Sequence, residues 1–525
     1  MWIMVNKRPF SPSTYLFLTV FVAGMSTLAI EFTTSRMLQT VYGTSNLVWA
    51  NVIGLVLLFL TLGYFLGGRL ADKRPFPPTF YLLVTWAGFA SVFFLLLTSV
   101  ILKTAAAAMA AINVGALVSS LVAVVVALAV PITLLGCISP FAIRLAVTDV
   151  AEAGRVSGRI YAISTWGSLL GTYLPVLVVI PTAGSRLTAV IFGGLLLVIG
   201  LLGYWQMAQT GRRAIFLLPL LLVPAVLAWT RGGIKAYEGQ IFEAESPYNY
   251  VQVVRSGDCN YLLLNEGQGI HSFYCDGGRV PRVSVWSIML AAPYFNEQPT
   301  LNNMAVIGLA AGTIPKQFTQ VFGPIPIDGI ELDPVIVAAG REYFGLTEPN
   351  INVIVGDGRY ELNRLNGRYD LITLDAYKVP YIPWHLTTRE FFGEVKAHLS
   401  DHGVIAINVG RAPNDRRLVD AMAATLHQVF PSLYAIDVPG SLNTILVATV
   451  GETTAVNLAT HLAALPETTD PLLRSAIEIA ADNLVPVGSS DIVFTDERAP
   501  VETIVDTLVI RYLLQEGAAG LPGIR

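Results

Sequence analysis

Three acidic residues follow three successive apolar segments in the second half of the chain, after a turn that is rich in glycine. The turn reads Val306-Ile-Gly-Leu-Ala-Ala-Gly-Thr313, and the acids are Glu331, Asp357 and Asp375. A glycine turn lets bare backbone approach a ligand, and a carboxylate accepts hydrogen bonds from ligand hydroxyls. The pattern therefore indicates a site that holds a polar, hydroxyl-bearing ligand.

These residues need a scaffold in which the ends of several strands converge. We expect strands at 304–308, 327–332, 353–355, 370–374 and 404–409, with helices near 314–322, 334–343, 359–365 and 387–399. An antiparallel pair at 434–438 and 443–449 closes the series. This order predicts an α/β domain with a mostly parallel sheet between two helical layers.

Ligands of such sheets bind at the carboxyl ends of the strands, which is where the three acids lie. Gly308 and Gly312 bracket the first turn, and Glu331 follows Gly312 by 19 residues, a spacing that suits contact with ribose hydroxyls. A single acid in such a loop is more often a helix cap or a solvated residue. Three acids at successive strand ends after a glycine turn favour a nucleoside pocket of the S-adenosylmethionine kind.

Before this domain, three short strands surround polar turns, at 251–254, 261–264 and 270–274. The turn Asn265-Glu-Gly-Gln-Gly269 predicts a hairpin. A hairpin centred on Gly267 pairs residues whose numbers sum to 534, which places Cys259 opposite Cys275. Two interpretations remain: two buried thiols, or a cross-strand disulfide, which requires an oxidising compartment.

The first half of the chain has a different composition. The 525 residues are 54% hydrophobic and 13% charged, with a mean hydropathy of +0.59, and nearly all long apolar runs lie before residue 232. This excludes a wholly soluble or a disordered chain, and a net charge of −4 excludes nucleic-acid binding driven by excess positive charge. Because a membrane span needs about 20 apolar residues, we expect a polytopic α-helical membrane domain with seven spans, at 12–32, 45–66, 79–101, 114–136, 160–181, 187–206 and 213–230.

The basic residues between the spans predict their orientation. The N-terminus and the even-numbered connections carry ten of them: Lys7, Arg8, Arg69, Lys73, Arg74, Arg144, Arg155, Arg159, Arg212 and Arg213. The odd-numbered connections carry three: Arg36, Lys103 and Arg186. We therefore expect a cytoplasmic N-terminus, and seven spans would then place the C-terminal domain outside the cytoplasm. An eighth span within 103–144 would reverse that placement.

The C-terminal motifs resemble those of the spermidine synthase family, the polyamine aminopropyltransferases, and in particular its members with a fused membrane domain. The resemblance covers roughly residues 245–449. It rests on the glycine turn, on Asp375 and on four short segments: Glu245-Ser-Pro-Tyr-Asn249, Leu263-Leu-Asn-Glu-Gly267, Glu331-Leu-Asp333 and Gly356-Asp-Gly358. In the first half, Gly158-Arg-Ile-Tyr-Ala-Ile-Ser-Thr-Trp-Gly167 is also similar to the fused members.

The resemblance implies a Rossmann-like fold of the class I methyltransferase kind, decarboxylated S-adenosylmethionine or S-adenosylmethionine as co-substrate, and an aminopropyl group as the part transferred. We expect no metal, because the six histidines show no metal-ligand spacing with cysteines or acids. It implies that Glu331 holds the ribose of the donor and that Asp357 and Gly358 contact its adenine. We also assign Asn249, Gly308 and Gly312 to donor binding. Asp375 would then be the base that removes a proton from the attacking amine, which needs a free lone pair to attack the carbon next to the sulfonium.

Several positions on the acceptor side depart from the family pattern. Ala311 replaces an acid of the glycine turn, Lys378 replaces an acid three residues after Asp375, and Val285 and Ser287 replace a tyrosine and a glutamate. A cation ~4 Å from a substrate ammonium costs about 4 kcal/mol at an effective dielectric of 20. Putrescine is therefore not the expected acceptor. The acceptor-side candidates are Tyr377, Lys378 and Trp384.

We expect four parts along the chain: a membrane domain at 1–232, a β-stranded part at 240–298, a Rossmann-like nucleoside-binding domain at 299–450 and a helical extension at 451–525. The leading hypothesis is a membrane-anchored transferase that contacts the lipid bilayer, acts on a small-molecule amine, forms a homo-oligomer and binds no nucleic acid. Two alternatives remain: a non-catalytic extracytoplasmic module that keeps the synthase fold, and a sensor domain on a transporter.

Overall fold

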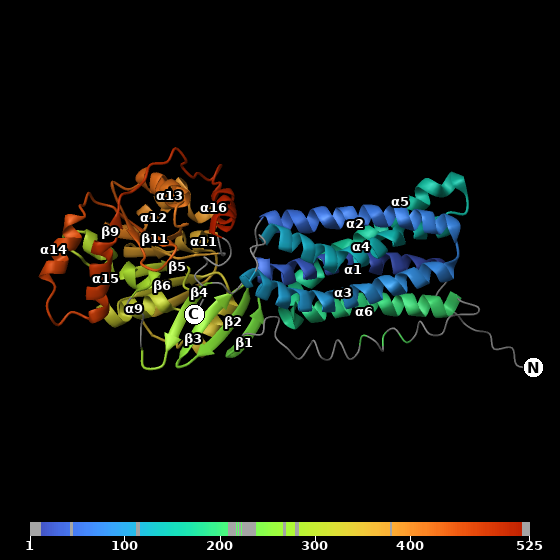
Figure 1. Cartoon of the computed structure of the whole chain (residues 1–525), viewed down its shortest axis with the longest axis horizontal. Coiled ribbons are helices and arrows are strands. Elements are labelled where there is room, and N and C mark those ends of the chain that lie inside the picture. The colour runs from blue at the N-terminus through green and yellow to red at the C-terminus, as the bar shows by residue number, and fades with distance from the viewer. Residues whose placement is uncertain are drawn as a thin grey trace, which may run out of the picture. The chain divides into compact units, whose positions relative to one another are not determined.

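The computed structural model describes residues 12–42, 46–111, 116–207, 238–265, 269–278, 283–377 and 381–516, together with residues 217, 219 and 222. Contacts divide the chain into two compact units, Met1–Ala236 and Tyr237–Arg525. Long helices make up the described part of the first unit, and the second contains two sheets covered by helices (Figure 1).

The helices of the first unit are apolar on most of their sides, which suits segments whose backbone groups must be satisfied within the helix. They are α1 (Pro12–Tyr42), α2 (Asn46–Lys73), α3 (Pro77–Ala111), α4 (Ala116–Ala146), α5 (Ala153–Leu174) and α6 (Ile180–Met207). In the part of the chain that the structure describes, five helical segments are long and apolar enough to cross a membrane: Ser13–Leu38, Trp49–Lys73, Pro77–Thr98, Leu121–Ala146 and Val150–Met207.

The fifth segment is 58 residues long and contains two helices. A π-helical turn, η2 (Pro175–Val179), follows α5, and the helical course breaks at Gly184, where φ is 75° and ψ is 163°. Because α5 and α6 both pack against α1, the chain reverses between them. The first six expected apolar runs therefore overlap α1 to α6, and the fifth also covers η2. The seventh, 213–230, lies almost wholly outside the described residues.

Glycines bring α1 and α5 into close contact. Gly167 lies against the backbone carbonyl of Phe21, and Gly171 lies against that of Met25, so a Cβ at either position would clash. Small residues permit this close approach of two backbones. In a membrane, van der Waals packing of this kind stabilises helix pairs, because burial of apolar side chains away from water gives no driving force there.

The second unit begins with a four-stranded antiparallel sheet in chain order: β1 (Gln240–Glu245), β2 (Tyr250–Ser256), β3 (Cys259–Leu264) and β4 (Ile270–Cys275). The prediction lacks β1, whose side chains show no alternation between buried and exposed positions. The register of β3 and β4 pairs Cys259 with Cys275, and their sulfur atoms are joined as a disulfide.

An eight-stranded sheet follows, with the strand order β12-β10-β11-β9-β8-β5-β6-β7. Its strands are β5 (Met304–Ile307), β6 (Ile327–Glu331), β7 (Ile351–Val355), β8 (Tyr369–Leu374), β9 (Leu399–Gly410), β10 (Ser432–Asp437), β11 (Asn443–Thr449) and β12 (Leu484–Val485). Strands β5 to β9 pair in parallel, and β10, β11 and β12 pair antiparallel. The Rossmann-like, methyltransferase-like fold predicted for this region is confirmed.

Helices cover both faces of this sheet (Figure 1). One apolar layer contains α11 (Gly358–Leu362), α12 (Arg389–Ala397), α13 (Arg417–His427) and α16 (Val501–Glu516). The other contains α8 (Val285–Ile288), η4 (Met289–Phe295), α9 (Thr313–Phe322), α14 (Val456–Ala464) and α15 (Pro471–Asp482). The remaining helix, α10 (Pro334–Tyr343), packs against the four-stranded sheet. The prediction lacks η4 and α13.

Candidate active site

The glycine turn brings the ends of β5 and β8 together. Gly308 has a φ of +88°, a left-handed conformation that glycine adopts without strain. A Cβ at this position would lie 2.5 Å from the backbone carbonyl oxygen of Asp375. The backbone N–H of Asp375 donates to the carbonyl of Ile307 at 2.9 Å. Gly312, with a φ of +93°, caps the start of α9. Both glycines predicted for this turn are therefore required by its geometry.

Glu331 is buried at the end of β6 with both carboxylate oxygens engaged. Its Oε2 accepts the backbone N–H of Ala310 at 2.8 Å, and its Oε1 accepts that of Asp333 at 3.0 Å. Burial raises the pKa of Glu331 to about 7, although the backbone donors lower it. Each carboxylate oxygen has two lone pairs, so the group keeps the capacity to accept a ligand hydroxyl beside the glycine turn.

Asn249 and Asp333 connect the small sheet to the Rossmann-like domain. One oxygen of the fully buried Asp333 accepts from the Ser246 hydroxyl and, at 3.0 Å, from Asn249 Nδ2. Its other oxygen caps α10 through the backbone N–H of Val335 at 3.0 Å. Asn249 Oδ1 accepts from Asn265 Nδ2 at 2.9 Å. Asn249, assigned above to donor binding, thus has protein partners for both polar groups and lies at the junction of the two sheets.

Asp357 follows β7 and caps α11, whose first residue is Gly358. Its Oδ1 accepts the backbone N–H groups of Arg359 and Tyr360 at 3.1 and 3.0 Å. Its Oδ2 lies 2.9 Å from Nε2 of His385, a partner that the sequence prediction leaves without a role. Asp357 therefore lies at the predicted strand end, and its side chain caps α11.

Asp375 follows β8, and each of its oxygens has a side-chain donor. The indole N–H of Trp286 donates to Oδ2 at 2.8 Å, and Nδ2 of Asn408 donates to Oδ1 at 2.9 Å. Asn443 Nδ2 donates to Asn408 Oδ1 at 2.8 Å, which fixes the Asn408 amide with its donor toward Asp375. Burial raises the pKa of Asp375 to about 6, although both side-chain hydrogen bonds lower it. A carboxylate with this pKa is ionised at neutral pH and can take up a proton.

Two acceptor-side candidates lie in the described part of the loop that follows β8. The hydroxyl of Tyr377 donates to the backbone carbonyl of Asn408 at 2.9 Å, and burial raises the pKa of Tyr377. Trp384 is 44% exposed and stacks edge-on with His385. Lys378 lies outside the described residues, so its effect on a diamine stays a prediction from the sequence.

The two donors to Asp375 are absent from the predicted site. Trp286 lies between Val285 and Ser287, the two residues that differ from the family pattern. Nothing in its local sequence relates it to Asp375. The sequence does distinguish Asn408 as a candidate site residue, because it is the only polar residue in the apolar stretch 404–409. A polar side chain at the carboxyl end of a buried strand belongs with the acids on the neighbouring strands.

Ala311 occupies the position in the glycine turn where the family pattern has an acid. It is 1% exposed and packs in an apolar cluster with Ile336, Ala339 and Phe344. Its backbone N–H donates to the Ser272 hydroxyl at 3.0 Å. The missing negative charge is therefore accompanied by an apolar environment that suits alanine.

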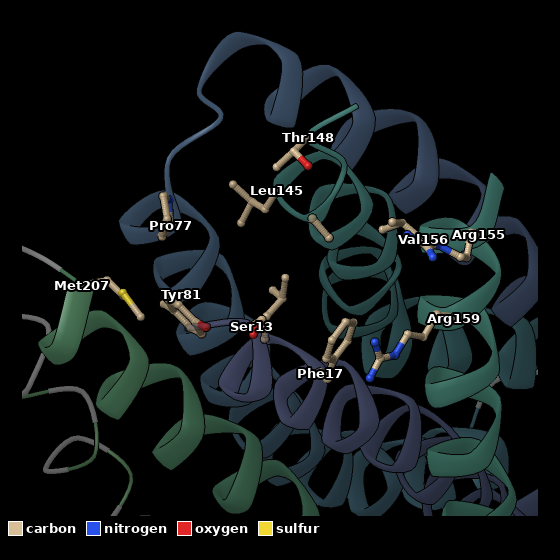
Figure 2. Close-up of a pocket in the computed structure, with 12 residues that line it drawn as sticks. Ser13, Phe17, Pro77, Tyr81, Leu145, Thr148, Arg155, Val156, Arg159 and Met207 are labelled. Carbon is tan, nitrogen blue, oxygen red and sulfur yellow. The ribbon is translucent and has the colours of Figure 1, made fainter. Parts of the chain in front are cut away.

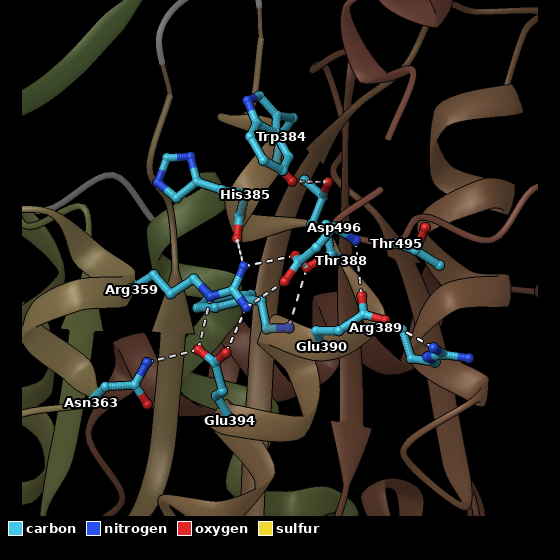
Figure 3. A network of polar contacts seen from close by, with 12 residues as sticks. Arg359, Asn363, Trp384, His385, Thr388, Arg389, Glu390, Glu394, Thr495 and Asp496 are labelled. Carbon is cyan, nitrogen blue, oxygen red and sulfur yellow. Dashed lines mark hydrogen bonds and ion pairs between the residues drawn. The ribbon is translucent and has the colours of Figure 1, made fainter. Parts of the chain in front are cut away.

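A polar network beside α11 connects Asp496 to Arg359 of α11 and Glu394 of α12. Arg359 donates from Nε to Glu394 at 2.8 Å and from its two terminal nitrogens to Asp496 at 2.8 and 2.9 Å. Figure 3 shows the guanidinium between the two carboxylates, with the Thr388 hydroxyl donating to Asp496. The Arg359 hydrogen bonds hold the pKa of Asp496 below its usual range. The network fastens the segment before α16 to α11 and α12.

Removing the cation from this network is expected to destabilise the unit. Arg359→Leu leaves Glu394 and Asp496 beside each other without a counter-charge, and we expect a loss of about 2 kcal/mol, between the values for exposed and buried pairs. Thermal and denaturant unfolding measure it. Arg368→Leu is the matched control, because Arg368 pairs with Asp401 at 3.4 Å while their side chains are 67% and 92% exposed. Equal losses in the two variants would contradict a special role for the network.

One family model matches part of the second unit. Residues 289–460 match the family model described as "Spermine/spermidine synthase domain". A probable polyamine aminopropyl transferase of Bifidobacterium longum is 30% identical over 279 residues, which is 50% of this chain and 61% of that protein. A polyamine aminopropyltransferase of Vibrio vulnificus is 36% identical over 154 residues, 29% of this chain and 50% of that protein. The eEF1A lysine and N-terminal methyltransferase of Mus musculus is 30% identical over 154 residues, 27% of this chain and 22% of that protein.

Among solved structures, that of a probable spermidine synthase from Corynebacterium glutamicum covers 49% of this chain and 99% of that chain, at 19% identity and a TM-score of 0.38. The alignments span 61% and 50% of the length of the two aminopropyltransferases. The matched stretch 289–460 contains Glu331, Asp357 and Asp375 together with Asn408. This part of the chain is a spermidine-synthase-like domain of Rossmann-like fold.

Proposed function

We propose that the chain is a membrane-anchored transferase that uses decarboxylated S-adenosylmethionine, or S-adenosylmethionine in its place, and that its acceptor is an amine other than putrescine. The observation that carries the proposal is the buried Asp375 carboxylate, held by Trp286 and Asn408 at the carboxyl edge of the sheet. Similarity to proteins named polyamine aminopropyltransferases supports the aminopropyl group as the part transferred. Five long apolar segments support the membrane anchor.

The reaction requires one base and no redox partner. The nitrogen lone pair of the acceptor attacks the methylene carbon that is bonded to the sulfonium, and a C–N bond forms as the C–S bond breaks. The electrons of the C–S bond pass to sulfur, so the leaving group is neutral methylthioadenosine when the donor is decarboxylated. The proton of the acceptor nitrogen passes to Asp375, whose negative charge also favours the cationic donor.

The donor half of the site is tested by Glu331→Gln. At pH 8, where Glu331 is ionised, we expect this variant to bind methylthioadenosine about 1–3 kcal/mol more weakly, because a charged hydrogen-bond acceptor is lost. Titration calorimetry of the full-length protein measures the change. Glu348→Gln is the control, since Glu348 pairs with Lys316 near the opposite, amino end of β7. Absence of wild-type binding at millimolar methylthioadenosine would contradict the nucleoside site.

The acceptor half is tested with putrescine. Wild-type protein should release no methylthioadenosine from decarboxylated S-adenosylmethionine and putrescine, because Lys378 repels one ammonium group of a diamine. Lys378→Asp removes the repulsion and should yield measurable putrescine-dependent release of methylthioadenosine, whereas an acid at Ala311 would enter an apolar cluster. Chromatographic detection of methylthioadenosine across a panel of amines gives both results. Turnover of putrescine by the wild-type protein would show that Lys378 does not face the acceptor.

A non-catalytic extracytoplasmic module is the second candidate, and the bonded sulfur atoms of Cys259 and Cys275 favour it. Disulfides persist in oxidising compartments, whereas both sulfonium donors are made in the cytosol. Seven spans after a cytoplasmic N-terminus would also place the second unit outside. In that compartment the synthase-like fold would lack its donor. The side of the membrane that the second unit faces therefore separates the two candidates.

A further inference from the structure

The first unit contains a cavity of about 550 Å³ at one end of its helices. The lining comes from the starts of α1, α3 and α5 and from the ends of α4 and α6, so these five helix termini meet around one space. Figure 2 shows Leu145, Tyr81 and Phe17 around this space and Arg155 and Arg159 along its α5 side. Neither the catalytic proposal nor the family match concerns this part of the chain.

The cavity is apolar along its walls and cationic at one side. Leu16, Phe17, Leu145, Val156 and Met207 supply hydrocarbon surface. The positive charge comes from α5, where Arg155 and Arg159 occupy positions four residues apart and hence the same helix face. A ligand that satisfies both surfaces must have an anionic head and an apolar tail.

The two arginines differ in how their charge is compensated. Arg155 donates to Glu152 at 2.5 Å, so a carboxylate already neutralises it. The guanidinium of Arg159 lies 4.4 Å from the centre of the Phe17 ring and has no carboxylate partner among the described residues. Stacking on an aromatic ring orients a guanidinium and leaves its N–H donors available to an anion. Arg159 is therefore the charge that a ligand would neutralise.

We propose that this cavity binds an acidic phospholipid, with the phosphate at Arg159 and an acyl chain along the apolar walls. The inference rests on the membrane placement in the proposed function. Arg69, Lys73, Arg74 and Arg144 lie at the same end of the helices, which by the positive-inside rule faces the cytoplasm. Anionic lipids give the cytoplasmic leaflet its negative surface. The same positive charges disfavour binding of a polyamine in the cavity. They also disfavour residues 1–11 as its occupant, because that segment contains Lys7 and Arg8 and no acid.

Lipid binding to the purified full-length protein tests the proposal. Native mass spectrometry in detergent compares dioleoylphosphatidylglycerol with dioleoylphosphatidylcholine at equal concentrations. We expect a preference for phosphatidylglycerol, and Arg159→Gln should weaken its binding about tenfold, the value of one charge-assisted contact. Arg159→Lys should retain most of the preference. Arg144→Gln is the matched control, because Arg144 lies at the same end but pairs with Asp72 at 3.5 Å, and it should bind as the wild type does.

Two further arms separate a lipid from a free anion. Val156→Trp fills the cavity without changing its charge and should also weaken phosphatidylglycerol. Inorganic phosphate at millimolar concentration should not displace the lipid, and displacement would overturn the proposal in favour of a simple anion site. Equal weakening by Arg159→Gln and Arg144→Gln, or unchanged binding in Val156→Trp, would also overturn it. Extraction of the protein from membranes by alkaline carbonate would instead refute the membrane anchor, so the two failures are distinguishable.

Discussion

Replacing Asp375 with asparagine is expected to lower the rate of the proposed transfer by about 10²- to 10⁴-fold, the contribution typical of a positioned general base. Asparagine has nearly the same shape and keeps a carbonyl oxygen that can accept from Trp286 or Asn408, but it cannot take up a proton. The measurement is methylthioadenosine release at saturating donor and pH 8, with the best amine from a panel. Wild-type turnover in the variant would rule out Asp375 as the base.

Asp370→Asn provides the matched control for this variant. Asp370 lies on the same strand, β8, but near its amino end, where it accepts from the backbone N–H of Asn302 and the hydroxyl of Ser400, both at 2.8 Å. The same chemical change at this position should leave turnover unaltered. Comparison of the two variants distinguishes the loss of the proposed base, Asp375, from a general effect of removing a carboxylate at or next to β8.

The pH dependence of the rate follows from the raised pKa of the same group. Asp375 must be ionised to accept a proton, so the rate should rise as the pH passes through about 6. The contribution of this group to stability should change in the opposite direction. Burial raises the pKa of both Asp375 and Glu331, so these two groups bind more protons in the folded chain than in the unfolded chain between about pH 4 and pH 7. The stability that these two groups contribute therefore falls as the pH rises through that window. Asp375→Asn removes one of these groups, so its melting temperature should change less with pH between about pH 4 and pH 7 than that of the wild type.

The scaffold of the site follows from the sequence pattern. The order of strands and helices predicted from the sequence includes β11 at 443–449 and α10 at 334–343, and the structure has both with the same bounds. Once the strands are known, the rule for parallel sheets places Glu331 and Asp375 at one edge, because each directly follows or ends its strand. The break in the helical course at Gly184, within α6, also lies in the gap between two expected spans, where glycine and serine interrupt the apolar run.

The immediate surroundings of the acids do not follow in the same way. Trp286 is 89 residues from Asp375 in sequence, and Asn408 is 33 residues away. Neither distance corresponds to a local spacing. Asn408 reaches Asp375 because β9 is the neighbour of β8 in the sheet. Trp286 reaches Asp375 because α8 packs on one face of that sheet. The raised pKa of Asp375 depends on burial by these distant segments, so it becomes visible only with the tertiary structure.

Loss of the Cys259–Cys275 bond is expected to lower the free energy of unfolding by about 3 kcal/mol, the value for a loop of this length. The two residues are 16 positions apart and face each other across β3 and β4, so the bond restricts the unfolded chain while the hairpin register already holds the pair together. Cys259→Ala with Cys275→Ala, unfolded thermally beside the wild type, measures the loss. A similar loss on adding reductant to the wild type, and none on adding it to the double variant, would assign the effect to the bond.

The three cysteines of the chain, Cys137, Cys259 and Cys275, report the compartment of the second unit. Cells are quenched in acid, and the denatured protein is labelled with a maleimide and weighed with and without prior reduction. Cys137 of α4 is a free thiol and serves as the internal control, so the extracytoplasmic placement predicts one label without reductant and three with it. Three labels in both samples would place the unit in a reducing compartment, where the donors are made and the transferase would have its substrate. One label would place Glu331 and Asp375 on the side that lacks the donor, and would favour a module that keeps the synthase fold without its reaction.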